Sequence, residues 1–204
     1  MKRPCKLNQR KSSLWNCVVF MICAFLITLL EFNFWFSQEF TIVEVSGGSM
    51  EDTLSDGDVL YADRYDEPNR GDIIIIDVSP YSNEKIFHGK YIIKRLIALE
   101  GDSVKCEDNA LYLRKAGTEE YVLLEEPYTN YRTDDFEELT VGVGEIFFLG
   151  DHRTNSTDSR VAQVGCLKLT DIVGVVPEWS IKHKGIINIF EQVRFAVSRI
   201  MTKE

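Results

Sequence analysis

A serine that follows two glycines is the first place in this chain where the residue types favour chemistry. The stretch Ser46-Gly47-Gly48-Ser49 comes just after a hydrophobic segment ends. Such a serine can lie on a tight turn with its hydroxyl exposed, and the glycines let a substrate backbone come close. Serine between glycines is nevertheless an ordinary turn sequence. Ser49 is therefore a candidate nucleophile only if the chain also supplies a base.

Lys94 is the candidate for that base. It lies in an apolar run, residues 91–99, that predicts a β-strand, and strand alternation turns Arg95 to the opposite face. Lys94 then shares its face with three apolar residues, Ile92, Leu96 and Ala98. Burial there lowers the pKa of a lysine because it disfavours the charged amine, and a neutral amine can take a proton from a serine hydroxyl. The alternative is that Lys94 ends at a sheet edge and reaches solvent.

A third segment, residues 150–160, combines hydroxyl groups, carboxylates and arginines. It is either a solvated loop or a set of side chains that holds the lysine in place through a serine hydroxyl and an Asp–Arg pair. Other chemistries have less support. His88, His152 and His183 lack metal-ligand spacing, and the chain has neither a phosphate loop nor a dinucleotide-binding glycine pattern. We therefore expect no metal and no cofactor.

The elements that must position these residues are short strands. Alternating or β-branched runs predict strands at residues 41–45, 58–62, 73–76, 91–99, 103–106, 110–113, 145–149 and 172–176. Residues 79–84 and 114–140 are polar and predict loops. No amphipathic helical pattern lies between residues 40 and 180, so we expect a mainly antiparallel β domain.

The N-terminal part of the chain predicts a membrane anchor. Residues 14–36 are predominantly apolar, and as a helix they span about 34 Å, enough to cross a bilayer. Trp15 and Trp35 suit the two aromatic belts of such a span. A cleaved secretory signal is the alternative, but residues 32–36 offer no small residues for a cleavage site. The basic tail, residues 1–13, predicts a cytoplasmic N-terminus, with everything after the anchor outside.

Charge and cysteine content narrow the classes of partner. Residues 1–30 hold five of the 23 Lys and Arg residues and no acidic ones, which leaves 18 basic groups against 32 acidic groups. Such an acidic domain argues against nucleic acid as a partner. Of the five cysteines, Cys106 and Cys166 lie in the main domain. A disulfide between them is compatible with an extracellular location, but the sequence does not show that they meet.

The C-terminal segment, residues 181–204, differs from the rest. Its apolar residues recur with roughly helical spacing, and lysines and arginines are interspersed among them, which predicts an amphipathic helix over residues 181–201. Two interpretations are open. The helix packs on the domain, or it lies on the outer leaflet of the membrane.

Four segments in this order behind an N-terminal anchor resemble the type I signal peptidases of bacteria, in the short single-anchor form of Gram-positive organisms. The matching segments are Ser46–Leu54, Arg70–Asp72, Lys94–Ile97 with Gly101-Asp102, and Gly150–Arg160. The resemblance covers nearly the whole chain. It implies a mainly β, antiparallel catalytic domain at residues 37–180, with a smaller β-rich insertion at residues 103–142.

The resemblance also implies roles for individual residues. Ser49 resembles the nucleophile and Lys94 the general base. Ser156 matches a hydroxyl that positions the lysine amine, and Asp158 and Arg160 match a structural ion pair near the site.

An oxyanion hole and a packing residue follow from the same resemblance. The Ser49 backbone N–H is the implied first donor to the oxyanion. The backbone N–H at Gly47 is the expected second donor, because this position lacks the serine hydroxyl found in other relatives. Met50 resembles a residue that packs beside the catalytic pair and the substrate.

The implied activity is removal of N-terminal signal peptides from exported preproteins, with cleavage after small residues at −1 and −3 through an acyl-enzyme. The expected enzyme is a single-pass monomer of the cell membrane whose partners are preproteins and membrane lipid. One alternative is a catalytically weak relative that acts as an assembly factor for particular secreted or surface-fibre proteins. Another is a self-cleaving Ser/Lys repressor-type protease, which the anchor and the lack of a DNA-binding region disfavour.

Four positions depart from the family pattern. Asp52 and Glu100 stand where proline is usual, Ala98 where glycine is usual, and His152 where asparagine is usual. Asp52 places a carboxylate three residues from Ser49. Close to Lys94, that carboxylate would favour the charged amine and oppose its function as a base.

Overall fold

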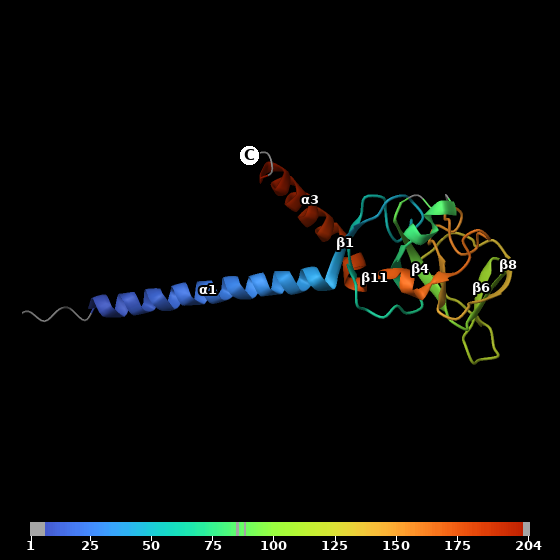
Figure 1. The fold of residues 1–204 in the computed structure, drawn as a ribbon, viewed down its shortest axis with the longest axis horizontal. Coiled ribbons are helices and arrows are strands. Elements are labelled where there is room, and N and C mark those ends of the chain that lie inside the picture. Colours follow the sequence, from blue (N-terminus) through green and yellow to red (C-terminus); the bar gives the residue numbers. More distant parts are fainter. Residues whose placement is uncertain (1–6, 85, 88, 202–204) are drawn as a thin grey trace, which may run out of the picture. The chain divides into compact units, whose positions relative to one another are not determined.

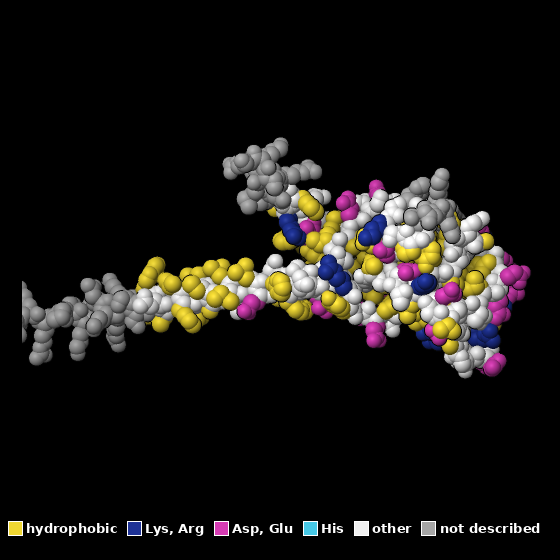
Figure 2. All heavy atoms as spheres, in the orientation of Figure 1, with side chains coloured by type: hydrophobic (Ala, Val, Ile, Leu, Met, Phe, Trp, Pro, Cys, Tyr) yellow, Lys and Arg dark blue, Asp and Glu magenta, His cyan; other side chains and the backbone are white. Residues whose placement is uncertain are grey.

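The computed structural model describes residues 7–84, 86–87 and 89–201 and divides the chain into two compact units, Met1–Phe40 and Thr41–Glu204. Within its described residues, the first unit contains one long helix, α1 (Leu7–Glu39). Its stretch Leu14–Glu39 has a mean hydropathy of 2.3 and is long and apolar enough to cross a membrane. Hydrophobic side chains lie along the face of this stretch that Figure 2 shows. The helix begins seven residues before the predicted anchor, within the predicted tail, and ends three residues after it.

Two hydroxyl groups in α1 are bonded within the helix itself. Thr28 Oγ1 donates to the Phe25 carbonyl and Ser37 Oγ donates to the Phe34 carbonyl, both at 2.8 Å. Such bonds satisfy a hydroxyl without water, which is what an apolar surrounding requires.

The second unit contains two antiparallel sheets (Figure 1). The larger has seven strands in the order β1 (Phe40–Glu44), β2 (Val59–Asp63), β11 (Ile172–Val176), β3 (Ile73–Asp77), β4 (Tyr91–Leu99), β9 (Glu145–Leu149) and β10 (Leu167–Lys168). The smaller has four strands in the order β7 (Val122–Leu123), β6 (Ala110–Arg114), β5 (Ser103–Glu107) and β8 (Phe136–Thr140). The mainly antiparallel fold expected from the sequence is confirmed.

The smaller sheet lies between β4 and β9 in the chain, within the stretch predicted as an insertion. Strands β7 and β8 fall in residues 114–140, for which we expected loops, and that expectation is wrong for these two segments. Both strands are mostly exposed. A strand that buries little of its surface lacks the apolar alternation by which strands are recognised.

Apolar side chains cover both faces of the larger sheet, as its interior strand β3 shows. Its four consecutive isoleucines are all buried. Ile73 and Ile75 join one core cluster with Met50 and Leu54, while Ile74 and Ile76 join another with Leu96 and Phe148. A strand buried on both faces is apolar throughout rather than alternating.

Strand β4 lies inside this sheet, between β3 and β9. Lys94 is paired with Ile74 on one side, and Arg95 with Leu149 on the other. The register with β9 shifts between Leu96 and Ala98. This irregularity interrupts the alternation, so Ala98 packs with Ile97 in a third core cluster and not with Leu96, contrary to the predicted face.

Short helical segments complete the unit. They are η1 (Ser79–Glu84), η2 (Leu169–Asp171), α2 (Glu178–Lys182) and α3 (Lys184–Met201). The predicted C-terminal helix is therefore two helices that meet at His183, and the first begins three residues earlier than expected. Residues 202–204 of the predicted segment lie outside the described residues.

Helix α3 packs on the domain through polar side chains. Glu191 is 1% exposed and accepts a hydrogen bond from the Tyr61 hydroxyl at 2.7 Å, and Asn188 accepts one from the Val59 N–H at 2.6 Å. Lys184 pairs with Asp58 at 2.7 Å. The apolar side chains on the outward face are Ile186, Ile189, Phe190, Val193 and Phe195, each 58–68% exposed. The helix thus presents its apolar face outward.

Candidate active site

The turn that carries Ser49 is anchored in the core by the residues that follow it. Met50 and Leu54 are buried, and the Leu54 N–H donates to the Met50 carbonyl at 2.8 Å. Gly47 has a φ of 86°, a left-handed conformation that favours glycine. The serine therefore lies on a turn whose one end is fixed by apolar burial and whose other end needs glycine.

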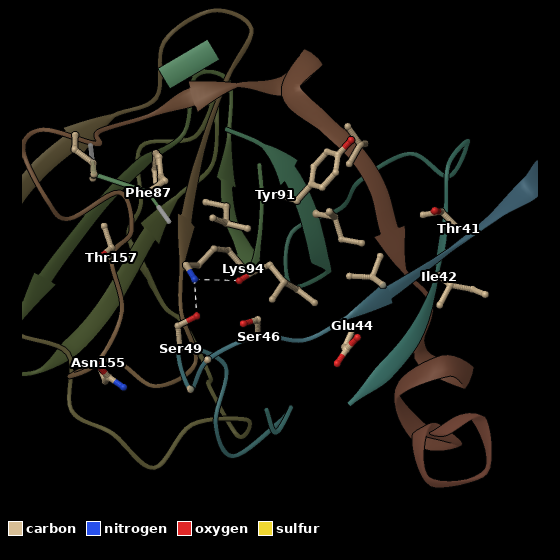
Figure 3. A pocket seen from close by; sticks show the side chains of 18 of the residues that line it. Thr41, Ile42, Glu44, Ser46, Ser49, Phe87, Tyr91, Lys94, Asn155 and Thr157 are labelled. Atoms are coloured by element: carbon tan, nitrogen blue, oxygen red, sulfur yellow. Dashed lines mark hydrogen bonds between the residues drawn. The ribbon is translucent and has the colours of Figure 1, made fainter. Parts of the chain in front are cut away.

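Lys94 points directly at this serine. Its Nζ donates to Ser49 Oγ at 2.6 Å and to the Ile93 carbonyl at 3.1 Å, as Figure 3 shows. Lys94 is 4% exposed, because β4 is an interior strand of the sheet. The alternative in which Lys94 reaches solvent at a sheet edge is therefore wrong.

Burial lowers the pKa of Lys94 to about 8, while the charges of Asp158 and Asp151 oppose this shift. Desolvation is the largest cause, since removing an ammonium group from water disfavours its charged form. A substantial fraction of the amine is then neutral in mildly alkaline solution. A neutral amine 2.6 Å from a hydroxyl has the geometry and the proton affinity of a general base.

The two carboxylates near Lys94 are each bonded to an arginine. Asp158 receives two hydrogen bonds from Arg160, both at 2.8 Å, so the predicted Asp158–Arg160 ion pair is present. Asp151 receives two from Arg95, at 2.7 and 2.5 Å. Because each carboxylate is already paired, neither forms a salt bridge with the lysine, whose amine can lose its charge.

Ser156 lies in the predicted segment but does not make the predicted contact. Its Oγ is buried and has no hydrogen-bond partner among the described residues, Lys94 included. The hydroxyl lies against Gly150, where an added Cβ would meet Ser156 Oγ at 2.2 Å and the Ser49 carbonyl at 2.5 Å. Residue 150 must be glycine for the segment to approach the Ser49 turn this closely.

Two further predicted roles are changed by the structure. The Gly47 N–H donates to Asp56 Oδ1 at 2.7 Å, so the expected second oxyanion donor is already occupied. Met50 is fully buried in a core cluster and is not among the residues that line the cavity. It therefore supports the turn from beneath. The Ser49 N–H has no acceptor within the part of the chain that the structure describes.

Asp52 does not approach the lysine. Its carboxylate accepts a hydrogen bond from Asn130 Nδ2 at 3.0 Å, and it does not contribute to the pKa shift of Lys94. Its φ is 64°, which a proline ring cannot adopt. The concern that this carboxylate opposes the base is therefore not supported, and the backbone here suits aspartate better than the usual proline.

A loop of the insertion, residues 126–133, braces the site, a role that was not predicted from the sequence. Arg95 lies over the Tyr128 ring at 3.7 Å from its centroid. Thr129 Oγ1 donates to the Asp151 carbonyl at 2.6 Å, and Arg153 pairs with Glu126. The signal that could have indicated it is the pair of buried arginines, since each needs a carboxylate partner.

A cavity of about 710 Å³ lies beside the candidate pair. Ser49 and Lys94 line it, together with Thr41–Glu44 of β1 and Tyr91–Ile93 of β4 (Figure 3). Strand β1 is an edge strand of the larger sheet. The arrangement can therefore accept an extended peptide along strand edges with its backbone near Ser49.

The described residues contain no cluster of three or more His, Cys, Asp or Glu side chains that could hold a metal ion. Cys106 and Cys166 are free thiols in the structure, so the disulfide that the sequence left open is not formed. Burial raises the pKa of both thiols to about 11. Ser49 is therefore the better candidate for a nucleophile.

Comparisons with known proteins point to one family. Residues 14–179 match the family model described as "Signal peptidase, peptidase S26". The chain is 37% identical over 164 residues to signal peptidase I of Bacillus licheniformis, covering 76% of this chain and 82% of that protein. It is 32% identical over 175 residues to signal peptidase I U of Bacillus subtilis, covering 81% and 87%. A crystal structure of a signal peptidase I from Enterococcus faecalis is 32% identical, with a TM-score of 0.42, and covers 55% of this chain and 98% of that one.

Proposed function

The chain belongs to the signal peptidase family, peptidase S26, and is a serine protease; from that premise we propose that it removes signal peptides from exported preproteins through Ser49 and Lys94. Ser49 is the nucleophile and Lys94 is the general base. The observation that carries the proposal is the 2.6 Å contact between Ser49 Oγ and the buried Lys94 Nζ.

Acylation uses both residues in turn. Neutral Lys94 takes the proton of Ser49 Oγ as the oxygen attacks the carbonyl carbon of the −1 residue, and the Ser49 N–H stabilises the oxyanion. Lys94 then gives this proton to the leaving amine, and the peptide bond breaks to leave an ester on Ser49. In the second half, Lys94 takes a proton from water as the water attacks the ester carbonyl. Lys94 then gives this proton to Ser49 Oγ, the bond between the acyl carbon and Oγ breaks, and the signal peptide leaves with a free carboxylate.

The substrate binds as an extended segment in the cavity beside the pair. Its backbone lies along the strand edges, and small residues at −1 and −3 direct their side chains into shallow apolar pockets. Apolar side chains from β1 and β4 among the cavity residues support this mode of binding, including Ile42, Val43, Ile92 and Ile93. The enzyme acts as a monomer.

Membrane anchoring belongs to the same proposal. The stretch Leu14–Glu39 of α1 spans the cell membrane uncleaved, with the basic N-terminus in the cytoplasm and Thr41–Glu204 outside. A preprotein is held in the same bilayer by its signal helix. Confinement of both molecules to one membrane raises their effective concentration, so a weak peptide contact is enough for turnover.

Helix α3 contacts membrane lipid in this proposal. Its outward face is apolar, and its inward face is tied to the domain by Glu191, Asn188 and Lys184, so the apolar face is held outward. The exposed Arg194 adds a cation suited to anionic headgroups. Replacing Ile189, Phe190 and Val193 together by glutamine should slow cleavage of a bilayer-embedded preprotein severalfold while leaving cleavage of a soluble peptide unchanged. Equal loss on both substrates would contradict lipid contact.

The test of the proposed function is a precursor-cleavage assay. The full chain in detergent micelles is mixed with an exported preprotein, and N-terminal sequencing of the product identifies the cleaved bond. Wild type should cleave, and Ser49→Ala and Lys94→Ala should not. Absence of cleavage by wild type, or cleavage by Ser49→Ala, would overturn the proposal. The alternative, a catalytically weak assembly factor, had as one reason the Asp52 carboxylate, which would oppose Lys94 as a base if it were close. This carboxylate is bonded to Asn130 instead.

A further inference from the structure

His152 holds the turn that carries Ser49 through two successive carbonyl groups. Its backbone N–H donates to the Ser49 carbonyl at 3.1 Å, and its ring Nδ1 lies 3.2 Å from the Gly48 carbonyl. The side chain is 16% exposed. The residue follows β9 in the chain, so the sheet fixes its position relative to the turn.

The partners of the ring nitrogen determine where its proton lies. Besides the Gly48 carbonyl, Nδ1 lies 3.0 Å from Glu51 Oε2. Both neighbours are hydrogen-bond acceptors, so Nδ1 carries a proton and donates it. This holds for the neutral ring with its proton on Nδ1 and for the charged ring alike. The contact with Gly48 therefore does not require His152 to be charged.

The Gly48 carbonyl belongs to the same peptide unit as the Ser49 N–H. The chain has no cis peptide bond among its described residues, so carbonyl and N–H point in opposite directions across a planar unit. Two donors, His152 Nδ1 and the Glu51 N–H at 3.2 Å, bond to this carbonyl and together fix the direction of the Ser49 N–H, which points away from His152. This N–H has no acceptor within residues 7–84, 86–87 and 89–201.

The ring and the peptide are each held from a second side. Tyr131 stacks on the His152 ring, with centroids 3.9 Å apart and planes inclined by 18°. The Glu51 carboxylate packs against Gly48, where an added Cβ would lie 2.8 Å from Glu51 Oε1. These contacts leave little freedom for the peptide to rotate.

We propose that His152 is a positioning residue that orients the Gly48–Ser49 peptide so that the Ser49 N–H can stabilise the oxyanion. The inference rests on the proposed function, because it takes Ser49 as the nucleophile. Loss of an oxyanion donor typically lowers kcat by about 10²–10³-fold. Removal of the His152 donor leaves the Gly48 carbonyl with the Glu51 N–H, at 3.2 Å, as its remaining donor, so the Ser49 N–H is held less firmly but stays in place. We therefore expect a smaller loss, about 10–10²-fold. KM should change little, because the oxyanion exists only in the transition state.

The experiment compares two variants of equal shape in the full chain. His152→Asn keeps an N–H donor one bond from Cγ, as in histidine, whereas His152→Leu has the same outline without a donor. The kcat and KM are measured on a peptide with alanine at −1 and −3. His152→Asn should keep most of the wild-type kcat, and His152→Leu should lose it at nearly constant KM. His152→Phe, which retains the ring for Tyr131, should behave like His152→Leu.

Three results would overturn the inference. They are an unchanged kcat in His152→Leu and His152→Phe, an equal loss in His152→Asn and His152→Leu, and a change confined to KM. Thermal unfolding by circular dichroism identifies a variant that does not fold, and the remaining donorless variant then decides. Failure of the proposed function is distinct, since there wild type cleaves nothing or Ser49→Ala still cleaves.

Discussion

Lys94 and Arg95 are adjacent buried basic residues on β4, but only Arg95 is bonded to a carboxylate. Arg95 is bonded to both oxygens of Asp151, donates to the Gly71 carbonyl at 2.6 Å and lies over the ring of Tyr128. Lys94 has a hydroxyl and one carbonyl as its partners. Arg95 is therefore paired with a carboxylate, whereas Lys94 forms no salt bridge with any residue that the structure describes.

The difference separates a structural cation from a reactive one. A buried cation that is paired with a carboxylate keeps its charge and holds the neighbouring residues in place. Without such a partner, burial favours the neutral form, which for lysine is a base. Arginine suits the first role, because it presents a planar fork and does not lose its proton.

The largest effect should come from removing the unpaired amine. Lys94→Met retains an unbranched side chain of similar length but has no group that takes the Ser49 proton. We expect kcat/KM for peptide cleavage to fall by about 10²–10⁴-fold, the usual contribution of general base catalysis. Steady-state kinetics on a soluble peptide measures it. Retention of wild-type activity would remove Lys94 from the mechanism.

The paired neighbour should affect stability instead. Arg95→Met leaves the Asp151 carboxylate, which is fully buried, without its counter-ion. Breaking a buried pair in this way costs roughly 3–5 kcal/mol of unfolding free energy. Urea unfolding of the two methionine variants provides the comparison, since Lys94→Met should be as stable as wild type or more so. Equal destabilisation by both would contradict the distinction drawn between the two cations.

The stability of the protein should depend on pH through Lys94. The folded pKa of about 8 lies below the ordinary value of 10.5, so the unfolded chain binds the proton more tightly. Stability relative to Lys94→Met should therefore rise with pH between about 8 and 10.5, by roughly 3 kcal/mol in all. Urea unfolding of both proteins at several pH values measures this difference. A constant difference would mean that the amine is charged in the folded protein.

The smallest effect should come from Asp52. In wild type, kcat/KM should increase as pH rises through about 8, where Lys94 loses its proton. Asp52→Asn removes a carboxylate three residues from Ser49 but bonded to Asn130. The midpoint of this pH profile should stay where it is. A midpoint shifted to lower pH in Asp52→Asn would show that this carboxylate acts on Lys94 after all.

Much of the fold could be predicted from local pattern. The strand predictions for residues 91–99, 145–149 and 172–176 agree with β4, β9 and β11, because apolar runs between turn residues mark buried strands. The exposed strand β7 and the two-residue strand β10 carried no such signal. The outward direction of the apolar face of α3 could not be predicted either. It depends on hydrogen bonds that Tyr61 and Val59 of β2 donate to Glu191 and Asn188.

For the site, residue type and resemblance indicated the participants but not their contacts. Ser49 and Lys94 are 45 residues apart, and alternation suggested only that the lysine is buried. The bond from Gly47 to Asp56 depends on the path of a loop, and the lack of a partner for Ser156 Oγ among the described residues depends on its rotamer; neither has a sequence signature. Arg95 and Asp151 are 56 residues apart, and nothing local indicates that they pair.

The brace from residues 126–133 makes the arrangement around Ser49 depend on a part of the chain that supplies neither Ser49 nor Lys94. Three consecutive residues that follow β9, Asp151, His152 and Arg153, are each held by that loop, through Thr129, Tyr131 and Glu126. A chain whose insertion is unfolded lacks all three contacts. The smaller sheet thus contributes to the active site by support, because it holds the segment that faces the Ser49 turn.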